Sequence, residues 1–186
     1  MKKMAMISAL AMLAAGGQAL AEDFNYHFLD AGLILADAGG SNDGKGLGVA
    51  GSMDVSGLYQ NATAFGGVSY VDFDGGNVLN LNGGMGFHWP LASVVDFNGG
   101  VALEYQKVSG GGGSDLGFSL NAGVRARPFA PAWELDGGLQ YVDIGQYEDT
   151  RIVLGARYTF SPGMSAGVHL NSGDIDYWML SVRWEL

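Results

Sequence analysis

Arginine and carboxylate side chains recur inside segments that otherwise alternate between apolar and small residues, and these charges are the first candidates for chemistry. They are Asp96, Glu104, Arg125, Arg127, Glu134, Asp136, Arg151, Arg157 and Arg183. A proline-containing turn at 128–131 separates two of these arginines from the next two carboxylates, so opposite charges on neighbouring segments can pair. Because an unpaired charge in a narrow interior is costly, the set predicts a network of ion pairs. A charged lining for a small pore is the alternative.

Histidine is the side chain best suited to acid–base catalysis near neutral pH, and the chain contains His27, His88 and His169. Neither His88 nor His169 has a serine or a carboxylate at a spacing that specifies a catalytic triad or dyad. The sequence also lacks a phosphate-binding loop, a zinc-binding spacing and a nucleophile elbow. We therefore expect no catalytic residue, no cofactor and no metal site, and histidines that hydrogen-bond to their neighbours.

Acidic residues gather in the segments that connect the apolar stretches. The segment 72–77 resembles the start of a calcium-binding loop, but the terminal glutamate and the full ligand spacing are missing. With 19 acidic against 9 basic residues, the formal net charge of −10 argues against a nucleic-acid partner. We expect solvated loop carboxylates, with divalent-cation bridges to lipopolysaccharide as the alternative.

The segments that position these charges have the pattern of β-strands. Three stretches, at 65–72, 98–105 and 136–143, share a Gly-Gly-aliphatic sequence followed by a tyrosine, and their spacing suits long hairpins. Turn residues between the alternating stretches predict strands at 26–36, 45–55, 58–71, 78–89, 94–108, 116–127, 132–144, 150–160, 164–172 and 176–186. The prediction is an all-β chain of about ten strands, with eight as the alternative.

Two chemically different kinds of connection alternate along the chain. The 4 prolines fall at one kind, next to aromatic residues, whereas the other kind is rich in Gly, Asp, Asn and Ser. Proline cannot serve a central strand but suits a tight turn. An even number of strands between two alternating kinds of turn is typical of a transmembrane antiparallel up-and-down β-barrel, with both termini on the proline-turn side.

A period of two assigns the faces of most strands. Along 116–127 the apolar residues oppose a set that contains Arg125 and Arg127, and along 150–160 they oppose a set that contains Arg157. An arginine at the lipid-facing midplane costs about 2–4 kcal/mol, so the charged phase must face the lumen. Tyrosines near one end and tryptophans near the other match two membrane interfaces. The phases of the first and third strands are ambiguous. The alternative to a membrane barrel is a secreted soluble barrel, in which the apolar face would point inward and the polar face outward.

Residues 1–21 have the pattern of a cleaved secretory signal peptide. Two lysines precede a short apolar stretch, which ends at a small-residue site formed by Ala19 and Ala21, with cleavage expected before Glu22. The prediction is therefore a signal peptide followed by one β-barrel domain at 22–186, located in the cell outer membrane. The chain has no cysteine, so no disulfide stabilises this domain.

Three features of the sequence carry a resemblance to a known family. They are Phe24, Asn25 and Tyr26, the Gly-rich segment at 44–52, and the Gly-Gly-x-x-Tyr segments. With them the chain resembles a family of small outer-membrane β-barrels that carries a quorum-sensing or diffusible-signal label. It also resembles the wider group of porin-like and OmpA-like barrels, whose final strand is read by the outer-membrane assembly machinery. The resemblance covers nearly all of 24–186 and supplies no catalytic residues.

The final segment alternates so that one of its faces carries Trp178, Leu180, Val182, Trp184 and Leu186. We expect this face to meet lipid and the strand to close the barrel against the first one. The resemblance to porin-like barrels implies that the segment is also the assembly signal. Barrels of that group usually end on an aromatic residue, whereas here Trp184 precedes a terminal leucine.

These observations predict a non-enzymatic integral outer-membrane β-barrel with an envelope or surface-interaction role and a largely plugged, salt-bridged lumen. A narrow pore for small solutes or ions is the first alternative, and a lipid-active or proteolytic barrel enzyme is the second. The expected partners are outer-membrane lipid, lipopolysaccharide and the barrel assembly machinery, and the expected state is a monomer.

Overall fold

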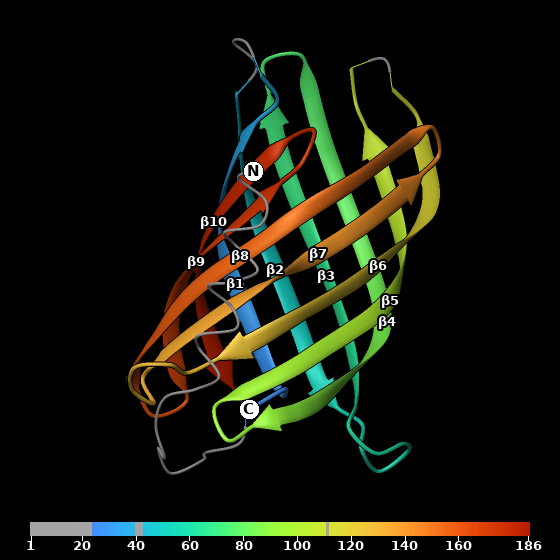
Figure 1. Cartoon of the computed structure of the whole chain (residues 1–186). Helices are drawn as coiled ribbons and strands as arrows, with labels where there is room; N and C mark the ends of the chain where they lie inside the picture. The colour runs from blue at the N-terminus through green and yellow to red at the C-terminus, as the bar shows by residue number, and fades with distance from the viewer. Residues whose placement is uncertain (1–23, 40–42, 111) are drawn as a thin grey trace, which may run out of the picture.

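Ten antiparallel strands follow one another in chain order around a closed barrel (Figure 1). The computed structural model describes residues 24–39, 43–110 and 112–186. The strands are β1 (Phe28–Asp37), β2 (Asp43–Asp54), β3 (Ala62–Phe73), β4 (Gly76–Ala92), β5 (Val95–Val108), β6 (Ser114–Ala126), β7 (Trp133–Ile144), β8 (Tyr147–Ser161), β9 (Met164–Ser172) and β10 (Asp176–Glu185). The predicted all-β fold and the ten-strand antiparallel barrel are confirmed, and the eight-strand alternative is wrong.

The expected signal peptide, including Ala19, Ala21 and Glu22, lies outside the described residues. Within the part of the chain that the structure describes, no helix has the length and apolarity needed to cross a membrane.

The strand predicted at 58–71 begins later than expected, because the chain from Val55 to Ala62 forms a compact turn. The amide of Leu58 donates to the carbonyl of Val55 at 2.8 Å, and the amide of Val55 donates to the carbonyl of Ala62 at 2.9 Å. Asn61 has a φ of 60°, in the left-handed region that asparagine tolerates better than most residues. The turn therefore contains residues that the apolar pattern had assigned to a strand.

The sequence pattern predicted that Pro90 lies in the connection after β4. In the structure it lies within β4 itself. The register between β4 and β5 shifts between Pro90 and Ala92. A proline has no amide hydrogen to donate to the neighbouring strand, so an irregularity is expected at this point. The other prolines lie in the connections after β6 and β8, at the same end of the barrel. We call this end the turn end and the opposite one the loop end.

The last strand closes the barrel against the first, as predicted. β1 and β10 pair without a break from Phe28 opposite Glu185 to Asp37 opposite Asp176. The amide of Leu186 extends this pairing by donating to the carbonyl of residue 27 at 2.9 Å. Closure leaves no open sheet edge, which a barrel wall in lipid requires.

Alternate residues of the strands face outward, and the outward set is predominantly apolar. The exposed side chains include Leu47, Leu81, Met85, Phe87, Trp89, Leu103, Leu116, Leu120, Leu139, Tyr158, Trp178, Leu180 and Trp184. Burial also settles the two ambiguous strands, because Ile34 of β1 and Val71 of β3 are buried whereas Leu33 and Tyr70 are exposed. The polar and charged phase of each strand consequently lines the lumen.

Candidate functional site

The turn end of the lumen is filled by buried charges from strands that are far apart in the sequence. We call this set the turn-end network, and its members are Asp30, Arg125, Arg127, Glu134, Arg157 and Arg183. Each member lies at or near the turn end of its strand, with Arg127 just after β6. Barrel closure brings Asp30 of the first strand beside the arginines of the last ones.

Asp30 bridges two arginines. Its Oδ2 accepts a hydrogen bond from Nη2 of Arg157 at 2.6 Å and one from Nε of Arg183 at 3.2 Å. Asp30 and Arg157 are only 6% and 3% exposed. The guanidinium of Arg183 also lies over the ring of Phe28, 3.7 Å from its centroid. Because water is largely excluded, each charge depends on its partners for stabilisation.

Glu134 bridges a second group of arginines and joins it to the first. Its Oε1 accepts hydrogen bonds from Nη2 and Nε of Arg125 at 2.8 and 3.1 Å. Nη1 of Arg183 lies 3.6 Å from the same oxygen, and Nη2 of Arg127 lies 3.7 Å from Oε2. The network therefore runs continuously from Arg157 on β8 to Arg127 after β6, across the bottom of the lumen.

The residues that precede β1 cover this network. The carbonyl of Asn25 accepts a hydrogen bond from Nη1 of Arg125 at 3.2 Å. The ring of Phe24, which is buried, lies 4.6 Å from the guanidinium carbon of Arg127, and the ring of Tyr26 lies 4.6 Å from that of Arg125. Cations over aromatic rings are attracted most strongly where water is excluded. Residues 24–27, which we call the N-terminal segment, therefore cover the network at the turn end.

Tyr26 fixes the N-terminal segment to the wall as well. Its ring stacks on that of His88, with centroids 4.1 Å apart, and its hydroxyl donates to Asp96 Oδ2 at 3.2 Å. Burial raises the pKa of Tyr26 well above its usual range, so the hydroxyl remains a donor. His88 Nδ1 lies 3.5 Å from the same oxygen of Asp96. The segment is thus held from β4, β5 and β6.

His169 lies above the network in a short row of residues across three strands. Asp136, Gly155 and His169 are direct neighbours in the registers of β7, β8 and β9. Gly155 has no side chain, so Asp136 and His169 approach over it, with Nδ1 and Oδ2 3.7 Å apart. The other ring nitrogen, Nε2, lies 2.8 Å from Nη2 of Arg157, which can only donate. Nε2 is therefore the acceptor and does not serve as a free base.

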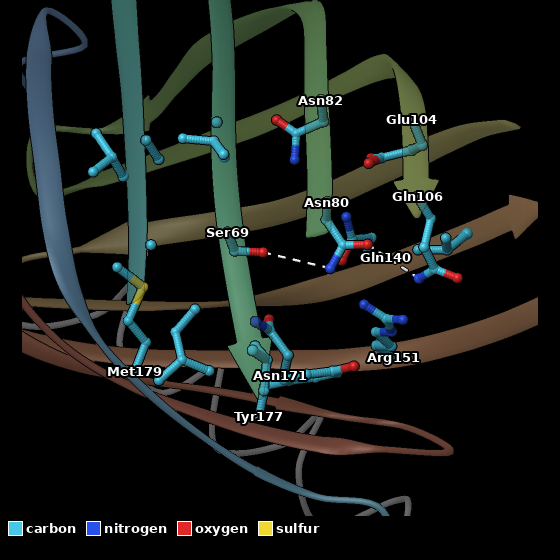
Figure 2. Close-up of a pocket in the computed structure, with 18 of the residues that line it drawn as sticks. Ser69, Asn80, Asn82, Glu104, Gln106, Gln140, Arg151, Asn171, Tyr177 and Met179 are labelled. Atoms are coloured by element: carbon cyan, nitrogen blue, oxygen red, sulfur yellow. Dashed lines mark hydrogen bonds between the residues drawn. The ribbon is translucent and has the colours of Figure 1, made fainter. Parts of the chain in front are cut away.

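The loop end of the lumen has a different lining. A cavity of about 300 Å³, which we call the loop-side cavity, is bordered by carboxamide side chains, apolar side chains, Glu104 and Arg151 (Figure 2). The carboxamides belong to Asn80, Asn82, Gln106, Gln140 and Asn171. Figure 2 shows them arranged around the lumen on strands from different parts of the chain.

Arg151 is held at one side of the loop-side cavity. Its Nε donates to Asp149 at 2.8 Å and its Nη2 donates to the hydroxyl of Tyr147 at 3.1 Å. The Tyr147 hydroxyl in turn donates to Asp149 at 2.7 Å. The guanidinium also lies 5.5 Å from the centroid of the Tyr177 ring. Arg151 is thus engaged by an anion, a hydroxyl and an aromatic ring from its own surroundings.

A second cavity, of about 360 Å³, lies between the carboxamide side chains of the loop-side cavity and the turn-end network. We call it the turn-side cavity. Ala50, Asn82, Glu104 and Gln140 border both cavities, so the two adjoin at this level of the lumen. Glu104 is held there by a hydrogen bond of 2.6 Å from the buried hydroxyl of Ser119.

The structure brings the predicted lumen charges together in four groups. The turn-end network contains Arg125, Arg127, Glu134, Arg157 and Arg183; the others are Asp96 with His88, Asp136 with His169, and Arg151 with Asp149, while Glu104 bonds to Ser119. Arg125 and Asp136 are opposite in register, yet Arg125 pairs with Glu134.

On β10, Trp178, Leu180 and Trp184 are exposed on the outer face, as is Leu186 after it, and Val182 of the same phase is half-buried.

Four contributors were missed by the sequence reasoning: Asp30, Asp149, Phe24 and Tyr26. A carboxylate at position 30 in the phase of Ile34 could have indicated the lumen side of the first strand, since lipid disfavours charge. The partnership of His169 with Asp136 needed two strand registers, which no local pattern supplies. Within the described residues, no group of three or more His, Cys, Asp or Glu side chains converges as a metal site.

No protein-family model and no curated protein matches this sequence. Solved structures of similar shape exist. The KdgM porin in complex with disordered oligogalacturonate is 8% identical, with a TM-score of 0.48, over 86% of this chain and 99% of that one. Neisserial surface protein A is 15% identical, with a TM-score of 0.43, over 86% of this chain and 95% of that one.

The outer membrane protein Ail of Yersinia pestis is 11% identical, with a TM-score of 0.45, over 85% of this chain and 98% of that one. Each of these proteins is similar to the present chain as a β-barrel, and none of the identities or TM-scores is high enough to indicate a shared function. The resemblance to the family with a quorum-sensing label gains no support from these comparisons.

Proposed function

We propose that the protein is a non-enzymatic integral barrel of the outer membrane, with an envelope role and a lumen closed at the turn end. The observation that carries closure is the bridging of four arginines by Asp30 and Glu134 beneath the N-terminal segment. Such a network resists rearrangement, because a displaced charge would lose its partner while it is still largely buried.

The outer face supports the membrane location. Monomeric soluble proteins rarely expose apolar patches larger than a few hundred Å², whereas apolar side chains are exposed on the outside of every strand pair of this barrel. Aromatic rings gather at two levels, with Tyr70 near the loop end and Trp89, Trp133 and Trp184 near the turn end. Rings at these levels suit the two membrane interfaces.

The proposal extends to partners that follow from a membrane barrel. The outward apolar side chains would contact outer-membrane lipid, and the acidic loops would lie among lipopolysaccharide headgroups. The strand that ends at 186 would be recognised by the barrel assembly machinery. A closed barrel has no sheet edge for a second copy to extend, so we propose a monomer. A signalling role is not part of the proposal, because none of the described residues of the lumen and loops supports one.

Labelling of introduced cysteines tests location and orientation, and the absence of native cysteine makes each label specific. Asp74→Cys places a thiol in the connection after β3, and Gln60→Cys places one in the connection after β2, at the opposite end. We expect a membrane-impermeant maleimide to label Asp74→Cys in intact cells, and Gln60→Cys only after permeabilisation. Both variants should fractionate with the outer membrane. A soluble periplasmic pool, or labelling of Gln60→Cys alone, would overturn the proposal.

A narrow pore is the second candidate, and the adjoining cavities favour it. Together they leave space in the lumen from the loop end down to the turn-end network. A pore would require the N-terminal segment to move away from Arg125 and Arg127. Steady ionic conductance by the purified wild-type protein in a planar bilayer would favour the pore over the closed barrel.

The absence of enzymatic activity remains part of the proposal, and His169 supports it. A histidine that acts as a general base needs one ring nitrogen free to accept a proton from a nucleophile or water. Nε2 of His169 instead accepts from Arg157, whose guanidinium nitrogens only donate. Hydrolysis of a lipid or peptide by the purified protein, lost in His169→Ala, would contradict this part.

A further inference from the structure

We propose that the loop-side cavity binds a neutral sugar ring. This inference goes beyond the proposed function, because it assigns a ligand class to the lumen whether or not the lumen conducts. It rests on the chemistry of the lining, which presents both hydrogen-bonding amides and apolar side chains.

The polar side is built from carboxamides on four different strands. Asn80 and Gln106 are held in place, since Gln106 Nε2 donates to Asn80 Oδ1 at 3.0 Å and Asn80 Nδ2 lies 3.4 Å from the hydroxyl of Ser69. Among the described residues, no side-chain hydrogen bond engages the amides of Gln140 and Asn171, which border the cavity. A carboxamide both donates and accepts, as a sugar hydroxyl does. The free amides therefore match a ligand with several adjacent hydroxyl groups.

The apolar side matches the other property of a sugar ring, its face of C–H groups. Ile34 and Val71 belong to a buried apolar cluster of β1 and β3, and Tyr177 and Met179 of β10 pack against it. Figure 2 shows Met179 and Tyr177 well separated from Gln106 across the cavity. The Tyr177 ring is also held by the guanidinium of Arg151 at 5.5 Å. Asn171 is the register neighbour of Tyr177, so a ring with one apolar face and a polar edge can contact both kinds of side chain.

The charges at the cavity favour a neutral ligand. Glu104 and Arg151 are the charged residues that border it, and each is already engaged, Glu104 by Ser119 and Arg151 by Asp149. A charged ligand would have to displace one of these partners or be desolvated without compensation. A neutral ligand displaces only the hydrogen bonds between the amides and water. These bonds cost little to exchange for hydrogen bonds to the ligand.

The size of the cavity agrees with one sugar ring. Its volume of about 300 Å³ lies at the lower limit of the range of about 300–1,000 Å³ that small-molecule sites occupy. A longer glycan would have to extend beyond these lining residues, so the loop-side cavity itself holds one unit.

Saturation-transfer NMR and calorimetry on the protein purified from outer membranes test the proposal. The detergent should carry no sugar headgroup, because such a headgroup would compete. The probes are methyl α-glucoside and maltose as neutral sugars, glucuronate as the anion and glycine betaine as the zwitterion. We expect saturation transfer to the ring protons of both neutral sugars, and weaker transfer to the two charged compounds.

Two variants locate the site, and a third serves as the matched control. Gln140→Ala and Asn171→Ala each remove one unused amide and should weaken maltose binding about threefold to tenfold. Asn98→Ala removes the same group from the turn-side cavity, which the ligand does not occupy, and should change affinity less than twofold, roughly the scatter expected of a neutral substitution. Heat-modifiable migration in gels confirms that each variant is folded.

Three outcomes would overturn the proposal. One is the lack of saturation transfer to either neutral sugar with the folded wild-type protein. Another is tighter binding of glucuronate or glycine betaine than of maltose, which would make the site one for charged solutes. The third is an equal loss in Asn98→Ala and Gln140→Ala. Conductance plays no part in these readouts, so a failure here is distinguishable from a failure of the proposed closure.

Discussion

The two halves of the lumen use polar side chains in opposite ways. At the turn end, Asp30 and Glu134 are each shared among arginines, and the N-terminal segment covers them. At the loop end, Gln140 and Asn171 border a cavity and bind no other side chain among the described residues. Bridged buried charges resist rearrangement, whereas amides exchange partners at little cost. This difference is the basis of our two proposals, that one end maintains closure and that the other binds a ligand.

Truncation of the last strand should have the largest effect, since it removes part of the wall on which both halves depend. Deleting 182–186 removes Arg183 and the residues that pair with the start of β1. We expect no heat-modifiable barrel in the outer membrane. Full-length Arg183→Lys is the control, because it retains the strand and a positive charge. Normal insertion of the truncated chain would refute the closing role of β10 and its proposed role as an assembly signal.

Removing Asp30 should strongly destabilise the turn end. Asp30→Ala leaves Arg157 and Arg183 buried without their shared carboxylate, for an expected loss of about 3–5 kcal/mol in the free energy of unfolding. Urea unfolding in micelles, followed by tryptophan fluorescence, measures it. Asp74→Ala, an exposed loop carboxylate, is the control and should change stability by less than about 0.5 kcal/mol. A loss below about 1 kcal/mol for Asp30→Ala would mean that the network is not rigid.

A side chain added at position 155 should lower the free energy of unfolding by an amount between those expected for changes at the turn end and at the loop end. A Cβ at this position would lie 2.5 Å from Nδ1 of His169 and would also contact the carboxylate of Asp136. Gly155→Val should therefore cost about 1–3 kcal/mol, measured by the same unfolding experiment. The control is Gly83→Val, where the added Cβ has no neighbour within 4 Å. Equal stability of the two variants would show that the row of Asp136 and His169 adapts freely.

A change in the loop-side amides should have the smallest effect on stability. Gln106→Ala removes one hydrogen bond to Asn80 and is expected to cost about 0.5–1.5 kcal/mol. Its effect should be several times smaller than that of Asp30→Ala in the same urea titration. If the two losses were equal, the contrast between an immobile end and an exchangeable end would not hold.

The barrel could be predicted from sequence because its wall is a local pattern. Alternation along 78–89 and 116–127 identified outward and inward residues, and arginine determined which phase avoids lipid. The pattern was uninformative for β1, where Phe28 and Ile34 face the lumen while Leu33 and Leu35 face outward. Asp30 was overlooked for this reason, although it is central to the turn-end network.

The contents of the lumen depend on contacts that no local pattern encodes. Asp30 and Arg183 lie 153 residues apart in the sequence and meet only because β1 pairs with β10. Phe24 precedes the predicted first strand and Tyr26 begins it, and the alternation of that strand was ambiguous, so neither residue was assigned a face. Their position over Arg125 and Arg127 follows from cation–π attraction and burial in the assembled barrel.

Planar-bilayer recording of the purified protein tests closure of the turn end most directly. The wild-type protein should show no steady conductance. The combined variant Phe24→Ala, Tyr26→Ala and Arg125→Ala should conduct, because it removes the covering rings and the arginine that holds them. Asn80→Ala, at the opposite end of the lumen, should remain silent. Steady conductance by the wild-type barrel, equal to that of the combined variant, would contradict a closed lumen.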